Sequence, residues 1–315
     1  MTRRRAIRNL IVAGAASSLP RLAAASLAGD PQDYVIRSEV RLVLLDVSVK
    51  DRNHGFVAGL SKDNFAVFED SVRQPITVFA NDDLPVTVGI LVDSSRSMTP
   101  KRADVIAAAE TFIEDSNPRD EVFVLNFNDT VKRGLPEQVP FSGDVKQLRA
   151  ALYRGIPEGR TALYDALVAG LDHLEIGRRD KKTLVAISDG GDTASRHTRR
   201  EALDRIERSV ATIYTVGLFN AGDQDQDPGI LTRVASISGG AAYFPANPSR
   251  MIAVCRGIAK DIRTRYTIGY VPQPGNGAER LRHIRVRVSA AGHPRLMART
   301  RTSYRYVSVE NTSSR

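Results

Sequence analysis

Hydrophobic and polar residues alternate with a strand-like period at both ends of the chain. Short β-branched runs, separated by polar turns, occupy residues 41–49, 65–70 and 76–79. Residues 266–270 and 283–288 form similar runs near the other end, and the second alternates strictly between apolar and polar positions. A strand with this alternation has one buried and one solvated face. We therefore expect β-structure at both ends of the chain.

The middle of the chain has a different pattern. Residues 86–93 form a nearly continuous apolar run that ends in Asp93, a pattern typical of a strand buried on both faces of a parallel sheet. Strand-like segments then alternate with segments of helical pattern. The expected strands are 122–127, 183–188, 212–217 and 241–244, and the expected helices are 101–116, 144–155, 161–176, 199–209, 229–237 and 249–264. This alternation predicts an α/β fold with a doubly wound, mostly parallel sheet.

The terminal strand regions are too small for either to bury its own core. Because both ends of an inserted α/β domain can emerge on the same side, we expect the two regions to combine. The prediction is a small all-β sandwich formed by the N- and C-terminal strands, with the α/β domain inserted between them. Its expected core residues are Leu42, Leu44, Phe68, Ile284, Val286 and Val288. The predicted boundaries are 29–84 for the N-terminal strands, 85–264 for the α/β domain and 265–315 for the C-terminal strands.

Residues 1–28 have the pattern of a signal peptide. Arginines lead into the apolar residues 10–16, and small residues follow at 23–28. The pair Arg3-Arg4 suggests the twin-arginine route, and the general secretory route is the alternative. A basic N-terminus that is not a signal peptide is the alternative interpretation. We expect an exported protein, periplasmic or secreted, with no transmembrane segment in the mature chain, because the apolar stretch is too short to span a bilayer.

The charge of the chain is partly local. The formal net charge is +9, but residues 1–28 hold five arginines and no acidic residue, so without them it falls to +4. That value does not favour a nucleic-acid partner. Arg285 and Arg287 lie on the polar face of the run 283–288 and could bind polyanions, although a solvated strand face is the favoured interpretation.

Cysteine and histidine offer little chemistry. The single cysteine, Cys255, excludes an internal disulfide and a cysteine-based metal site, and its apolar surroundings in the sequence predict a buried, inert thiol. None of the five histidines falls in a ligand-like spacing, and only His197 is near the oxygen-rich segments described next.

Three segments with oxygen-bearing side chains are expected at one edge of the parallel sheet. Asp93, Ser95 and Ser97 follow the first buried strand, Thr161 begins a helix, and Asp189 follows the strand 183–188. Ligands of open parallel sheets bind beyond the carboxyl ends of the strands. A set of carboxylates and hydroxyls suits a small hard cation, Mg²⁺ first and Mn²⁺ second. Capping of the following helix is the alternative role for such Ser and Asp residues.

These motifs resemble von Willebrand factor type A domains, a family that includes integrin I domains, and especially the bacterial secreted proteins related to them. The resemblance covers residues 35–307. It implies a metal-ion-dependent adhesion site made by an Asp-x-Ser-x-Ser motif, a distant Thr and a distant Asp. The matching residues are Asp93, Ser95, Ser97, Thr161 and Asp189. It also implies a vacant coordination position for a partner's carboxylate. Arg160 stands where the family often has glycine.

We therefore expect a non-enzymatic, divalent-metal-dependent protein-binding module of the cell envelope, acting in adhesion or as an adaptor. Its partner would be a protein that supplies an Asp or Glu carboxylate. The alternative is a metal-dependent hydrolase using the same site, which would need a general base or an activated nucleophile within reach. Asp165 and Asp192 are candidates to orient the ligands, and Asp192 could instead begin a turn.

Overall fold

The computed structural model describes residues 42–81, 83–219, 225–273 and 280–306. The predicted signal peptide at 1–28 lies outside these ranges. A six-stranded sheet at the centre of the α/β part has the order β10-β9-β8-β5-β6-β7. Its strands are β5 (Thr87–Asp93), β6 (Glu121–Phe127), β7 (Val131–Arg133), β8 (Lys182–Ser188), β9 (Thr212–Gly217) and β10 (Ala242–Tyr243). All neighbours are parallel except β6 and β7, which pair antiparallel.

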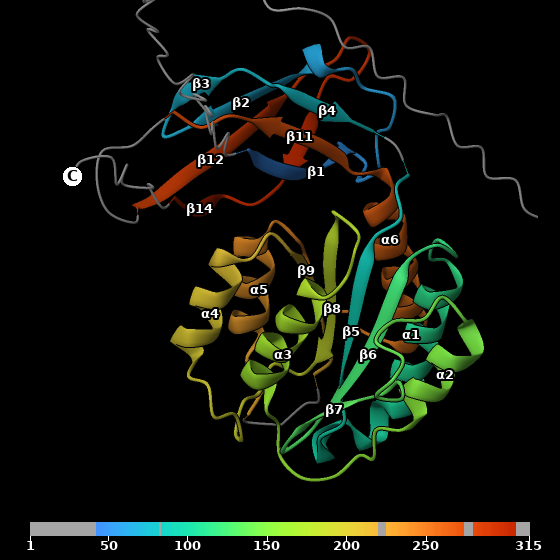
Figure 1. The fold of residues 1–315 in the computed structure, drawn as a ribbon. Coiled ribbons are helices and arrows are strands. Elements are labelled where there is room, and N and C mark those ends of the chain that lie inside the picture. The colour runs from blue at the N-terminus through green and yellow to red at the C-terminus, as the bar shows by residue number, and fades with distance from the viewer. Residues whose placement is uncertain (1–41, 82, 220–224, 274–279, 307–315) are drawn as a thin grey trace, which may run out of the picture. The chain divides into compact units, whose positions relative to one another are not determined.

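Helices cover both faces of this sheet. They are α1 (Arg102–Glu114), α2 (Val145–Tyr153), α3 (Leu163–Glu175), α4 (Arg199–Arg208), α5 (Pro228–Ser238) and α6 (Pro248–Thr264), with a short 3-10 helix, η2 (Arg96–Lys101), before α1. Helices α1, α2 and α6 pack together on one face, and α3, α4 and α5 pack on the other (Figure 1). The predicted doubly wound α/β fold is confirmed.

Strand β5 is buried along its whole length because it has partners on both edges and helices on both faces. All seven of its residues are buried, and it pairs with β6 on one side and β8 on the other. A Cβ atom at Gly89 would lie 2.3 Å from Cζ of Phe123 and 2.6 Å from Cδ2 of Leu184. The absence of a side chain at Gly89 therefore lets two large core residues meet over β5.

The terminal strands form two four-stranded sheets, β13-β1-β11-β4 and β14-β12-β2-β3. Their bounds are β1 (Val43–Asp51), β2 (Phe65–Glu69), β3 (Val72–Gln74), β4 (Val78–Ala80), β11 (Tyr266–Tyr270), β12 (Arg280–Val288), β13 (Leu296–Arg299) and β14 (Ser303–Tyr306). Each sheet contains strands from both ends of the chain, because β1 pairs with β11 and β2 pairs with β12. The predicted sandwich of N- and C-terminal strands is confirmed.

The predicted core of this sandwich is partly wrong. Leu42 and Leu44 are 41% and 45% exposed, and the fully buried residues of β1 are instead Leu45 and Val47. Leu42 and Leu44 alternate with these residues and share their face with Asp46. Turning that face inward would bury a carboxylate, which costs more than exposing two leucines.

On the other sheet the prediction is partly correct. Ile284 is buried, and Val286 and Val288 are half-buried and pack against the same core. Phe68 is also half-buried, but the inner positions of β2 belong to Phe65, Val67 and Glu69. Phe68 therefore lies on the outer face of the sheet, one residue out of phase with the core.

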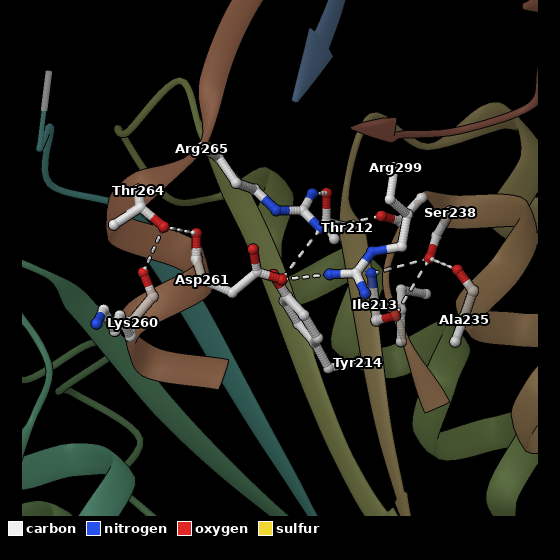
Figure 2. A network of polar contacts seen from close by, with 11 residues as sticks. Thr212, Ile213, Tyr214, Ala235, Ser238, Lys260, Asp261, Thr264, Arg265 and Arg299 are labelled. Carbon is white, nitrogen blue, oxygen red and sulfur yellow. Dashed lines mark hydrogen bonds and ion pairs between the residues drawn. The ribbon is translucent and has the colours of Figure 1, made fainter. Parts of the chain in front are cut away.

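A buried polar network connects α6, β9 and β13 (Figure 2). The Asp261 side chain is 0% exposed, and its Oδ2 accepts hydrogen bonds from the Tyr214 hydroxyl at 2.8 Å and from the Arg299 guanidinium. Arg265, whose side chain is 4% exposed, lies 3.7 Å away. Burial raises the pKa of the Asp261 carboxyl, but Arg265 and Arg299 outweigh it and hold the pKa below its ordinary value.

Candidate metal centre

Asp93 and Asp189 lie at the carboxyl ends of two neighbouring strands. Asp93 is the last residue of β5, and Asp189 directly follows β8. The register pairs Val92 with Ile187, so both strands end at the same edge of the sheet. The two side chains are almost fully buried, with residue exposures of 1% and 3%.

A chain of hydrogen bonds connects the carboxylates through two serines. The Ser95 amide donates to Asp93 Oδ1 at 2.8 Å, and the Ser95 and Ser97 hydroxyls are 3.1 Å apart. The Ser97 hydroxyl in turn donates to Asp189 Oδ2 at 2.6 Å. Four of the five predicted metal ligands are therefore in direct contact. Ser95 makes no side-chain capping hydrogen bond to η2, so the alternative capping role is not observed for it.

Ser188 is a site residue that the sequence interpretation missed. It is fully buried at the end of β8, and its hydroxyl donates to Asp93 Oδ2 at 2.6 Å while accepting from the Gly190 amide at 3.1 Å. The only signal in the sequence was its place directly before Asp189. Because β8 is the neighbour of β5, the Ser188 hydroxyl can hold Oδ2 of Asp93 in place.

The electrostatics of the site favour a cation. Burial raises the pKa of the Asp93 carboxyl to about 6, and Asp189 adds to this, while hydrogen bonds from Ser188 and Ser95 act in the opposite direction. Within the described ranges neither carboxylate forms an ion pair with a basic side chain. A divalent cation would supply the missing charge, and carboxylate and hydroxyl oxygens are suitable donors for Mg²⁺ or Mn²⁺. The donor set therefore fits such an ion.

The described residues contain no group of three or more His, Cys, Asp or Glu side chains that could hold a metal. A metal at this site would therefore depend on the hydroxyls as well as on the two carboxylates. This dependence separates the site from thiolate- or imidazole-based centres.

Thr161 is close to the other ligands through backbone contacts. It is 6% exposed, and its carbonyl accepts from the Thr193 amide at 2.8 Å, in the loop after Asp189. The Arg96 amide donates to the Gly159 carbonyl at 3.2 Å, which ties the loop before Thr161 to the loop after Asp93. The three predicted segments thus meet. The Thr161 hydroxyl itself makes no hydrogen bond to another described residue.

The Arg160 side chain contacts Asp129 and the Thr193 backbone. Its guanidinium forms an ion pair with Asp129 at 3.0 Å and donates to the Thr193 carbonyl at 3.2 Å. The two side chains are 68% and 45% exposed, so the pair adds little stability. The ion pair does, however, fix the position of the Arg160 side chain against Asp129.

Asp165 and Asp192 hold loops and do not contact the four hydrogen-bonded ligands. Asp192 accepts hydrogen bonds from the Tyr164 amide at 3.1 Å and from the Ser195 hydroxyl at 2.6 Å. Oδ1 of Asp165 accepts a hydrogen bond from the His197 amide at 2.9 Å and lies 2.7 Å from Nδ1 of the His197 ring. Both carboxylates therefore organise the segment that follows Asp189. Backbone hydrogen bonds and His197 hold the pKa of Asp165 below its ordinary value despite partial burial, which acts to raise it.

The part of the chain that holds the five predicted metal ligands matches a known protein family. Residues 88–191 match the sequence model of the von Willebrand factor type A domain. Residues 88–191 form a von Willebrand factor type A domain. The matched region extends from β5 to the loop after β8, so it includes all five predicted ligands of the type A domain. No curated protein matches the chain.

Solved structures similar to the chain include several type A domains. A von Willebrand factor type A protein from Catenulispora acidiphila is 16% identical with a TM-score of 0.49, and the match covers 85% of this chain and 75% of that one. The domain of a type V pilus tip protein from Porphyromonas gingivalis is 13% identical with a TM-score of 0.47, covering 57% and 95%. Proximal thread matrix protein 1 of the mussel byssus, with a zinc-occupied metal-ion-dependent adhesion motif, is 14% identical with a TM-score of 0.47, covering 62% and 49%.

Proposed function

We propose that this protein is a divalent-cation-dependent protein-binding module of adhesion or adaptor type. Asp93, Ser95, Ser97, Thr161 and Asp189 would hold Mg²⁺ or Mn²⁺ at the edge of the type A sheet. The observation that carries the proposal is that two serines contact two buried carboxylates, neither of which pairs with a basic side chain among the described residues. The presence of a von Willebrand factor type A domain supports an interaction module.

The charged and the neutral ligands would have different roles at the metal. Asp93 and Asp189 would neutralise most of the cation's charge, and the Ser95, Ser97 and Thr161 hydroxyls would orient it without further neutralisation. Ser188 would keep Asp93 in place through its hydrogen bond to Oδ2. A bound divalent ion supplies positive charge and a coordination position for an incoming carboxylate. A partner with an exposed Asp or Glu is therefore the expected ligand.

A metal-dependent hydrolase is the second candidate, and it needs a group that activates water. One candidate for this role is His197, which follows Asp189 by eight residues in the sequence; its imidazole contacts Asp165 and its side chain is 46% exposed. A divalent-metal titration against generic phosphoester and peptide substrates separates the two functions. Turnover that is lost in His197→Ala and in Asp93→Ala would favour the hydrolase.

Metal binding can be tested directly by calorimetry. We expect Mg²⁺ to bind the full chain and Asp93→Ala to abolish this binding, because the variant loses a charged ligand and keeps the core. Ser95→Ala should weaken binding less, since a neutral hydroxyl contributes less to a hard cation. Glu158→Ala is the matched control, because Glu158 is an exposed carboxylate on the loop before Thr161. An unchanged affinity in Asp93→Ala would exclude the proposed site.

Partner binding should follow the metal. In a pull-down from an envelope extract, binding should disappear with EDTA and return when Mg²⁺ or Mn²⁺ is added in excess. The Asp93→Ala protein should capture no partner even with Mg²⁺ present. Capture that survives both EDTA and this substitution would place the interface elsewhere on the molecule.

The proposed setting is the cell envelope or the extracellular space, as expected of the bacterial secreted type within the family. The predicted signal peptide supports it, and its mature N-terminus would lie between Ala25 and Asp30. Among the described residues no helix is both long and apolar enough to cross a membrane. Mass spectrometry of the natively expressed protein tests export, and recovery of the intact Met1 form from the cytoplasm would contradict it.

A further inference from the structure

The outer face of the sheet β14-β12-β2-β3 carries an arginine cluster around Phe68. Arg285 of β12 pairs with Phe68 across one edge of β2, and Arg73 of β3 pairs with it across the other. Arg287 is two residues beyond Arg285, on the same face of β12, opposite Ala66. Strands β3, β2 and β12 are adjacent in the sheet (Figure 1). We call these residues, Phe68, Arg73, Arg285 and Arg287, the arginine face.

Phe68 orders two of these guanidinium groups. The guanidinium carbons of Arg285 and Arg287 lie 5.5 Å and 5.1 Å from the centroid of its ring. Cation–π contacts at such distances favour positions of the guanidinium near the ring and leave its N–H groups available to donate. A carboxylate can accept two of these N–H groups in parallel. The arginines are therefore partly ordered for carboxylate recognition before a ligand arrives.

The charge of the arginine face is not neutralised within the described part of the chain. Arg73, Arg285 and Arg287 are exposed and form no ion pair there. Two other arginines of β12 differ, because Arg282 pairs with the buried Glu69 and Arg280 lies 3.5 Å from Asp70. A hollow of about 580 Å³ adjoins one end of the arginine face. Phe68, Arg73 and Arg287 line it together with Asp63 and with residues of the sandwich core, whereas Arg285 lies outside it. The surface thus has excess positive charge and room for a ligand.

The spacing of the arginines fits an extended chain. Alternate residues on one face of a strand are about 6.7 Å apart, so Arg285 and Arg287 repeat with the period of an extended peptide. An acidic peptide with carboxylates at alternate positions has the same repeat. Proteins that bind single-stranded nucleic acid usually combine a basic groove with aromatic rings on which the bases stack. Phe68 is already in contact with two guanidinium groups. Charge and spacing together therefore favour a peptide.

We propose that the arginine face binds an extended acidic segment of a partner protein, with Asp or Glu at alternate positions. This surface lies on the sandwich and contains none of the proposed metal ligands. Binding here needs no cation. The protein would then have two interaction surfaces of different chemistry, one for a metal-bound carboxylate and one for a row of carboxylates.

Fluorescence anisotropy with a labelled peptide of alternating Glu and Ser tests this proposal. The measurement uses the full chain with EDTA present, so that the candidate metal centre cannot contribute. Asp93→Ala should bind the peptide as well as the unmodified chain does. The double variant Arg285→Gln/Arg287→Gln should lower the affinity by about tenfold or more, because two charge-assisted contacts are lost. Phe68→Leu should give a smaller loss, since it keeps the arginines and removes the ring that orders them.

Arg280→Gln is the matched control, because it removes a charge from the same strand at a position already paired with Asp70. It should change the affinity by less than about twofold. Thermal melting of each variant checks that the fold is retained. Unchanged peptide binding in the double variant would overturn the proposal. Equal affinity for a single-stranded oligonucleotide of the same charge would also overturn it, in favour of a nucleic-acid surface.

Discussion

Two buried ionisable residues show how the same physical cause leads to different roles. Burial raises the pKa of Asp93 to about 6 and that of the Cys255 thiol to about 12. Asp93 is surrounded by hydroxyl and amide donors and lies near a second carboxylate, so its environment suits a cation. Cys255 is 0% exposed on α6, and burial is the cause of its raised pKa. A thiol in such a position is inert.

The inertness of Cys255 can be measured as a function of pH. A rise in pKa from 9.0 to about 12 lowers the thiolate fraction near neutral pH by about a thousandfold, and only the thiolate reacts with disulfide reagents. We expect almost no reaction of the native chain up to pH 9 and full reaction in denaturant. Val210→Cys is the control, because Val210 is 66% exposed and its replacement should react at once. Rapid labelling of native Cys255 would show that α6 opens or that the thiol is exposed.

At the scale of elements, the Asp261 network determines how α6 is fixed. The carboxylate joins α6 to Tyr214 of β9 and Arg299 of β13, and Arg265 follows the end of α6 (Figure 2). A buried ion pair adds little net stability compared with apolar packing, but removal of one partner leaves the other charges unpaired. The network is therefore a sensitive point of the fold.

Asp261→Asn should destabilise the protein by about 3–5 kcal/mol, since Arg265 and Arg299 would lose their counter-charge. Urea unfolding measures this change. Asp204→Asn is the matched control, because Asp204 is 43% exposed and pairs with Arg305, and a loss below about 1 kcal/mol is expected there. The lowered pKa of Asp261 means that its contribution is present at neutral pH and is lost as the pH falls through a value below 3.8. A loss in Asp261→Asn as small as in the control would contradict this role.

At the scale of the whole molecule, the sandwich depends on segments separated by about two hundred residues in sequence, such as Leu45 and Ile268, which are register partners. The C-terminal strands also supply partners for buried polar groups of the N-terminal ones. Glu69 of β2 accepts hydrogen bonds from Tyr304 at 2.7 Å and from Arg282. Without these partners a buried carboxylate would remain unpaired, so neither set of strands should be stable alone.

Deletion of residues 273–315 tests this dependence. It removes β12, β13 and β14, so β2 loses its neighbour β12 and β1 keeps only β11. We expect limited proteolysis to cleave the N-terminal strands while the α/β domain, predicted at 85–264, survives. The full chain is the control and should be protected in both regions. Full protection of residues 42–80 in the truncated protein would show that the N-terminal strands fold without the C-terminal ones.

The sequence alone determined the fold class and most of the candidate site. The continuous apolar run of β5 and the alternation after it required a buried parallel sheet with helices on both faces. Asp93 ends one strand of that sheet, and Ser95, Ser97 and Asp189 come directly after strands, so the common direction of parallel strands predicts that they meet at one edge. These are local patterns, and periodicity within a segment is sufficient to interpret them.

Only the tertiary structure decided which faces and which partners were used. Periodicity placed Leu44 and Leu45 on opposite faces of β1 but gave no pairing register with strands far along the chain. The contact of Ser188 with Asp93 and the cation–π contact of Arg285 with Phe68 both depend on that register. Register between distant strands is set by the packing of the whole core and by the need to pair buried charges such as Glu69. Because these packing and pairing energies arise only when distant segments meet, the pattern within a single segment cannot predict the register.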